Sequence, residues 1–116
     1  MNDGWITECI MRAIPLLSKW RGGRTKVWEF DPTHSKITLR IEFRGVPGNL
    51  HIICGGCRHI NGPFAWKDCG LEIQAHVDGE TMALVDTHAG FELVFELLSL
   101  RENVEPVYHP SLGSVE

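Results

Sequence analysis

The feature that most constrains the fold of this chain is the alternation of apolar and polar residues in KITLRIEFR, residues 36–44. Four apolar side chains fall on one face of this segment, and polar or charged side chains fall on the other. The apolar face consists of Ile37, Leu39, Ile41 and Phe43. A two-residue period is typical of a β-strand with one buried and one solvated face, as in many antiparallel sheets. The segment therefore predicts an antiparallel sheet at the centre of the fold.

The same alternation recurs between turn residues along most of the chain after residue 24. Further strands are expected around residues 26–30, 50–54, 71–77, 82–84 and 91–97, the last as one long strand. Asp78-Gly79 is a residue pair typical of a two-residue β-hairpin turn. Short turns between successive strands favour a meander, in which each strand pairs with its neighbour in the chain.

The N-terminal segment, about residues 4–21, has a different period. Ile6, Ile10, Ile14 and Leu17 recur at the spacing of one face of an amphipathic helix. Pro15 lies inside this pattern, and an interior proline removes a helix hydrogen bond and clashes with the preceding turn. We therefore expect either a kink at this position or a break after which Pro15 opens a second short helix.

These patterns predict one α+β domain over residues 1–116, a length that suits a single hydrophobic core. The helix should pack on an antiparallel meander sheet of five to six strands at about residues 24–100, either curved or folded into a sandwich. The segment at about 101–116 contains Pro106 and Pro110 and is expected to be an extended tail. Free sheet edges would allow two copies to pair.

Charge and hydropathy narrow the classes of partner. Eleven basic and fifteen acidic residues give a net charge of −4, which does not favour binding to nucleic acid. No basic-then-apolar leader and no apolar run of roughly 18 residues occurs, so we expect a cytoplasmic protein that does not enter a membrane. In that compartment the four cysteines are expected to be reduced rather than paired in disulfides.

The motif that most resembles chemistry is HIICGGCRH, residues 51–59. Its C-x-x-C turn admits a zinc site, a redox pair, or a hairpin turn at Gly55-Gly56 with cysteines that only fill space. The zinc site would use Cys54, Cys57, Cys69 and His59, with Cys9, His51 and His76 as possible substitutes. A second C-x-x-C and a helix directly after the motif are both missing. The packing interpretation is therefore favoured.

Large aromatic residues give a second indication of function. Trp28 and Phe30 are two residues apart on one expected strand, so they should share a face of the sheet. Such residues are usually buried in the core. If the pair were exposed instead, it would indicate a surface that binds a partner.

The runs ITLRIEFRGVPGNLHI and ALVDTHAGFELVFELLSL are similar in rhythm to a group of small bacterial proteins that begin with a helix and continue through an antiparallel sheet. Some of those proteins are uncharacterised, and some resemble immunity proteins that neutralise a partner toxin. The resemblance spans about residues 37–100 and assigns no functional residue.

Together these features favour a non-enzymatic protein-binding module that is immunity-like or binds to itself as a homodimer. A zinc-binding module is the second hypothesis, and a thiol-dependent or hydrolytic enzyme is the third.

Overall fold

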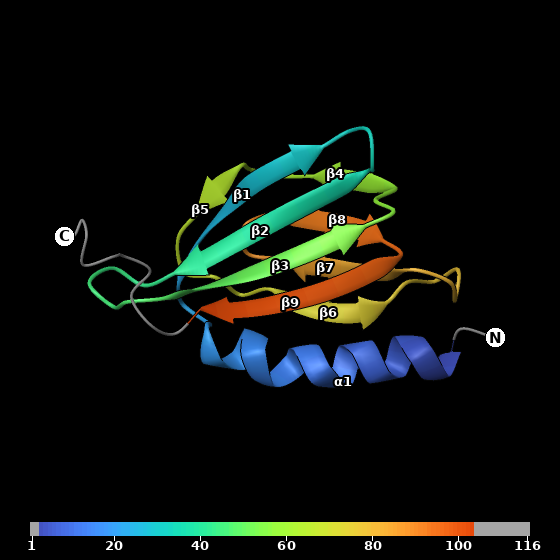
Figure 1. Cartoon of the computed structure of the whole chain (residues 1–116), viewed down its shortest axis with the longest axis horizontal. Helices are drawn as coiled ribbons and strands as arrows, with labels where there is room; N and C mark the ends of the chain where they lie inside the picture. Colours follow the sequence, from blue (N-terminus) through green and yellow to red (C-terminus); the bar gives the residue numbers. More distant parts are fainter. Residues whose placement is uncertain (1–2, 104–116) are drawn as a thin grey trace, which may run out of the picture.

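Within residues 3–103, which this computed structural model describes, the chain forms one helix and nine strands (Figure 1). In chain order they are α1 (Asp3–Lys19), β1 (Arg24–Asp31), β2 (Lys36–Glu42), β3 (Asn49–Gly55), β4 (His59–Asn61), β5 (Ala65–Trp66), β6 (Glu72–Ala75), β7 (Met82–Asp86), β8 (Phe91–Phe95) and β9 (Leu97–Asn103). The predicted α+β class and antiparallel pairing are confirmed. There are more strands than the expected five to six, partly because β4 and β5 are too short to produce a visible alternation.

The strands form two sheets that lie face to face as a sandwich. The first sheet has the order β5-β1-β2-β3-β9, and the second has the order β4-β8-β7-β6. Side chains from both inner faces meet in one core, and the largest fully buried ones include Leu39, Ile52, Phe91 and Phe95. Burial of each such side chain contributes about 1.5–3 kcal/mol, so the alternation seen in the sequence supplies the main stabilisation of the fold.

Helix α1 closes one long side of the sandwich, beside β6 and β9 (Figure 1). Its buried stripe consists of Ile6, Ala13 and Leu17, and Trp20, directly after the helix, is buried as well. The helix continues through Pro15 as a single element, so the predicted break with a second short helix does not occur. Pro15 is exposed, and water can therefore solvate the carbonyl that its missing N–H leaves without a helix donor. Within residues 3–103, no helix is long and apolar enough to cross a membrane.

The chain crosses between the sheets twice at one corner. The expected long strand at residues 91–97 is instead two strands, because β8 ends at Phe95 in the second sheet and β9 begins at Leu97 in the first. Gly55-Gly56 does not form a hairpin either, since β3 lies in the first sheet and β4 in the second. The two crossings are joined by a hydrogen bond from the backbone N–H of Glu96 to the carbonyl of Gly55, at 3.0 Å.

The end of β9 is attached to the end of α1. Trp20 donates its indole N–H to Glu102 at 2.8 Å, and the Lys19 ammonium lies 2.7 Å from the same carboxylate. The predicted tail boundary near residue 101 therefore falls inside a strand that extends to Asn103. The remainder of the expected tail lies outside the described residues.

Candidate protein-binding surface

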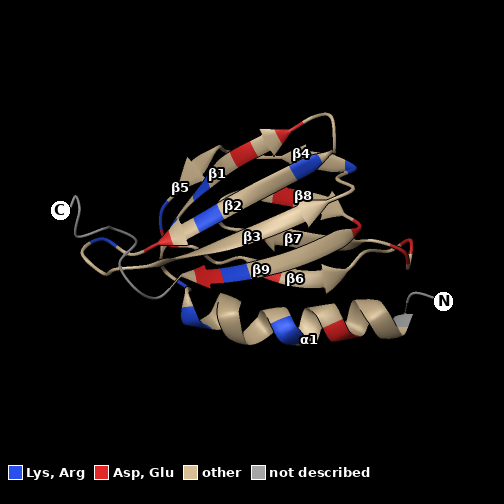
Figure 2. Cartoon of the chain, in the orientation of Figure 1, with Lys and Arg blue, Asp and Glu red and all other residues tan. Residues whose placement is uncertain are grey.

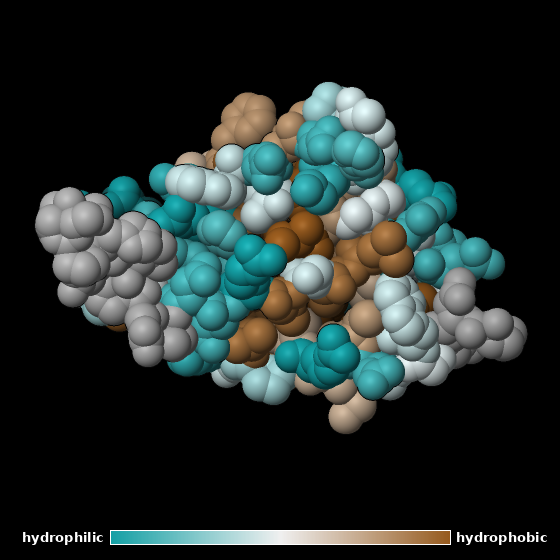
Figure 3. All heavy atoms as spheres, in the orientation of Figure 1, coloured by the Kyte–Doolittle hydropathy of each residue, from teal (hydrophilic) through white to brown (hydrophobic). Residues whose placement is uncertain are grey.

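The long side of the sandwich opposite α1 carries large apolar side chains that face solvent. Trp28 is 48% exposed, Phe30 60%, Ile60 43% and Phe64 80%. They come from β1, from β4 and from the connection between β4 and β5, which lie along the upper edge in Figure 1. We call these four residues the apolar rim. Figure 3 shows apolar atoms at this upper edge, and it also shows a second apolar area in the middle of the first sheet.

A β-bulge in β1 places the two aromatic residues of this strand on different faces of the sheet. The register between β1 and β2 shifts between Val27 and Glu29, so Trp28 is an additional residue in the strand. The prediction that Trp28 and Phe30 share a face is therefore wrong. Trp28 lies against the outward-facing Arg40 and His51, whereas Phe30 pairs with the inward-facing Ile37 at the unprotected edge of the sheet. Both aromatic residues are nevertheless exposed, which is the condition that indicated a partner-binding surface.

The Trp28 side chain is held in place by its neighbours on the outer face of the first sheet. The Arg40 guanidinium lies 4.2 Å from the centroid of the indole ring, and the His51 ring lies 6.0 Å away. A cation over an indole face is attracted by the ring quadrupole. Burial, followed by the nearby charges of Arg40 and Arg101, lowers the pKa of His51. The neutral imidazole is therefore favoured beside Trp28.

Phe30 and Ile60 belong to opposite sheets and line one pocket of about 230 Å³. Its other lining residues are Pro32, Ser35, Ile37, Cys57, Arg58 and His59. The pocket is where the two sheets separate at the side that lacks a helix. An apolar anchor from a partner would find there both an exposed ring and an apolar hollow, the arrangement found at the centre of many protein interfaces.

The loop that carries Phe64 is held by contacts with β7 and β8 of the second sheet. The Trp66 indole N–H donates to Asp86 at 2.8 Å, and its ring lies 4.7 Å from that of Phe91. A side chain at Gly62 would collide with the backbone of Phe91 at 2.7 Å, which shows how closely the loop approaches the second sheet. Phe64 is thus an exposed ring on a fixed support. The sequence did not identify Ile60 or Phe64 as surface residues of interest, although Phe64 follows a Gly-Pro turn and lies outside every alternating segment.

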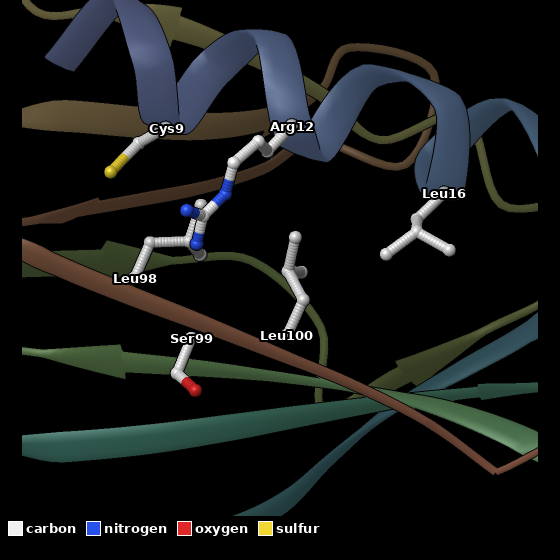
Figure 4. Close-up of a pocket in the computed structure, with 6 residues that line it drawn as sticks. All are labelled: Cys9, Arg12, Leu16, Leu98, Ser99 and Leu100. Carbon is white, nitrogen blue, oxygen red and sulfur yellow. The ribbon is translucent and has the colours of Figure 1, made fainter. Parts of the chain in front are cut away.

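A second hollow lies between α1 and β9, with a volume of about 300 Å³. In Figure 4, Leu98 and Leu100 point toward the helix, while Ser99 points away from it. Its six lining residues are Cys9, Arg12, Leu16, Leu98, Ser99 and Leu100. Leu16, Leu98 and Leu100 are only partly exposed, unlike the rim residues. We interpret this hollow as the gap left because α1 packs mainly on β6.

The predicted zinc ligands are not all brought together. Cys54 is 0% exposed on the inner face of β3, as expected, and the Cys57 thiol donates to its carbonyl at 3.3 Å. Burial raises the pKa of both thiols. The backbone N–H of Cys69 instead donates a hydrogen bond to the carbonyl of Gly23, directly before the start of β1. The start of β1 lies beside Glu42 of β2, whereas Cys54 lies beside Ile37 of the same strand. These two positions of β2 are five residues apart, which corresponds to about 17 Å.

His59 is exposed and lies 3.6 Å from Glu92. Within residues 3–103, no group of three or more His, Cys, Asp or Glu side chains is arranged to hold a metal ion. Zinc binding stays a prediction, for which the structure brings together Cys54 and Cys57 but not Cys69.

The fold and the rim define a class: a two-sheet antiparallel sandwich with one side closed by a helix and the other lined by exposed apolar residues. Comparison with known protein families, with curated proteins and with solved structures finds no match for this chain.

Proposed function

We propose that this protein is a non-enzymatic module that binds another protein through the apolar rim. The observation that carries the proposal is the exposure of four large apolar side chains, between 43% and 80%, along a single side of the sandwich. Exposed apolar residues that gather in one place are typical of interaction sites, and aromatic residues are enriched at binding hot spots.

The support beneath the rim favours binding over an accidental exposure. Trp28 is stacked against Arg40, and the Phe64 loop is anchored through Trp66. Side chains that are already ordered lose less conformational entropy when a partner binds. Neutralisation of a partner, as in immunity proteins, and self-association are both compatible with such a surface.

The test compares a rim variant with a control of matched hydrophobicity. F30S/F64S removes two rim aromatics, and M11S/I14S removes two exposed apolar residues of α1 on the opposite side. Binding partners captured from the source cells would be identified by cross-linking and mass spectrometry, purified, and titrated against each variant. Self-association would be measured by sedimentation equilibrium.

We expect F30S/F64S to weaken binding of the purified partner, or of a second copy, at least tenfold. M11S/I14S should change it less than twofold. Equal affinity for the wild type and F30S/F64S, with both proteins folded by circular dichroism, would contradict the proposal.

A further inference from the structure

We infer that the segment recognised by the rim carries carboxylates, which bind in a basic pocket at the start of β1. This inference rests on the proposed function and adds the chemistry of the partner. The pocket has a volume of about 420 Å³, and its lining includes Arg24, Lys26 and Lys67. These three side chains are brought together by the pairing of β1 with β5, in which Lys26 lies opposite Ala65.

The positive charge of this pocket is balanced only in part by the chain within residues 3–103. None of the ion pairs among residues 3–103 involves Arg24, Lys26 or Lys67. One carboxylate also lines the pocket: Glu42 lies opposite Arg24 in the pairing of β1 with β2, and its carboxylate is 3.3 Å from the guanidinium of Arg40. Three cations therefore share one hollow in a protein of net charge −4. An anionic group would relieve their mutual repulsion.

The pocket and the rim form one continuous strip. The Lys26 ammonium lies 5.7 Å from the centroid of the Trp28 ring, and Ala65, which lines the pocket, directly follows Phe64. The pocket of Phe30 and Ile60 lies toward the other end of β1. Eight residues of strand extend about 26 Å. A partner segment of similar length in extended form would reach from the basic pocket to this apolar one.

The charges along β1 change sign, which gives the strip a direction. Figure 2 shows basic residues toward the start of β1 and acidic residues toward its end. Arg24 and Lys26 occupy the first half, and Glu29 and Asp31 alternate with the aromatics in the second half. A peptide can place its carboxylates at the basic end alone. A nucleic acid carries phosphates along its whole length and would also meet Glu29 and Asp31, so a protein segment is favoured.

The test uses a displayed library of random 12-residue peptides, selected on the whole wild-type chain. Peptides that lose binding to F30S/F64S are then synthesised and titrated against two charge-reversal variants. R24E/K67E alters the basic pocket at two exposed positions, and R12E/R101E makes the same change of charge elsewhere on the surface. Thermal unfolding confirms that each variant is folded, and a 12-residue oligothymidylate is titrated in parallel.

We expect the rim-dependent peptides to be enriched in Asp and Glu. They should bind R24E/K67E at least tenfold more weakly than the wild type and R12E/R101E within threefold of it. Rim-dependent peptides without acidic enrichment that bind R24E/K67E normally would overturn the inference and leave the proposed function intact. Oligothymidylate binding that requires Arg24 and Lys67 would assign the pocket to nucleic acid instead. Failure to select any rim-dependent peptide would count against the proposed function itself.

Discussion

At the scale of single residues, Asp86 shows how an irregular segment is attached to the sandwich. Its side chain is 1% exposed and accepts hydrogen bonds from the Trp66 indole at 2.8 Å, from the Gly70 N–H at 2.8 Å and from the Ala89 N–H at 3.2 Å. A buried carboxylate is tolerated only when such donors compensate for the lost water. One residue at the end of β7 therefore fixes the loop that carries Phe64.

We predict that Asp86→Ala lowers the free energy of unfolding by about 3 kcal/mol, because it leaves three partly buried donors without their acceptor. Urea unfolding followed by tryptophan fluorescence measures the loss. Glu72→Ala, at an exposed position of β6, is the control and should change stability by less than about 0.5 kcal/mol. A loss in Asp86→Ala no larger than that of the control would show that the Asp86 contacts are dispensable.

His51 gives a prediction about pH. Burial and the charges of Arg40 and Arg101 lower its pKa in the folded chain, against a smaller opposite effect of Glu29. As the pH falls below about 6.5, the unfolded chain therefore binds a proton before the folded chain does, and stability falls. Urea unfolding at pH 7.5, 6.0 and 5.0 should show a smaller decrease for His51→Gln than for the wild type. Parallel decreases in the two proteins would refute this role.

At the scale of elements, the sequence predicted whatever repeats regularly. The alternation in β2 and the apolar stripe of α1 specify their own structure, because each buries one face against the same core. The sequence did not reveal where the chain changes sheet. Continued alternation after Phe95 would place Leu97 on the inner face, but the chain turns at Glu96 and Leu98 faces inward instead. The adjacent apolar pairs Val27-Trp28 and Leu97-Leu98 are the only local signs of the bulge and the crossing.

The rim was predictable only in part, because it depends on pairing between segments that are distant in the sequence. Trp28 and Phe30 were recognised as a possible partner-binding pair, but the exposure of an edge residue depends on which strand ends beside it. β5 pairs only with Thr25 and Lys26, which leaves the second half of β1 uncovered. That pairing joins residues some forty positions apart, and no local pattern contains it.

The sheet-crossing corner predicts a graded sensitivity of glycines. Gly56 has a φ of +61°, and an added Cβ would lie 2.7 Å from the Glu96 carboxylate, which pairs with Arg58. Gly45 has a similar φ of +75° but open space around it. We expect Gly45→Ala to cost about 1 kcal/mol from backbone strain and Gly56→Ala about 3 kcal/mol from strain and collision. Equal losses in urea unfolding would show that the corner accommodates a side chain freely.

The two cysteines of the same corner distinguish packing from metal binding. If they only pack, Cys54→Ser should cost about 2 kcal/mol, because it places a hydroxyl in a fully buried site, and Cys57→Ser less than about 1 kcal/mol. The Tm of the wild type should not respond to EDTA. Equally large losses in both variants, an EDTA-sensitive Tm and close to one zinc per chain would instead establish the zinc hypothesis.

At the scale of the whole molecule, the two long sides of the sandwich are closed in different ways. On one side α1 covers the space between β6 and β9, and Trp20 stacks on Phe43 at 5.5 Å as well as bonding to Glu102. On the other side no helix covers the sheet edges within residues 3–103, and the apolar rim faces solvent. Under the proposed function, the contacts of Trp20 stabilise the side of the core that lies away from the partner, so a mutation there should affect stability without affecting binding.

This separation predicts the outcome of a double-mutant cycle with Trp20→Phe and Glu102→Gln. Trp20→Phe removes the donor of the charge-assisted hydrogen bond between the end of α1 and β9, and Glu102→Gln leaves a neutral acceptor and removes the ion pair with Lys19. Each single change should cost about 1.5–3 kcal/mol. The double variant should lose less than the sum, because the two residues share that bond. Hydrogen exchange should become faster in α1, while the affinity of a rim-binding peptide stays within twofold of the wild type. A matching loss of peptide affinity would mean that the helix side and the rim are coupled through the core.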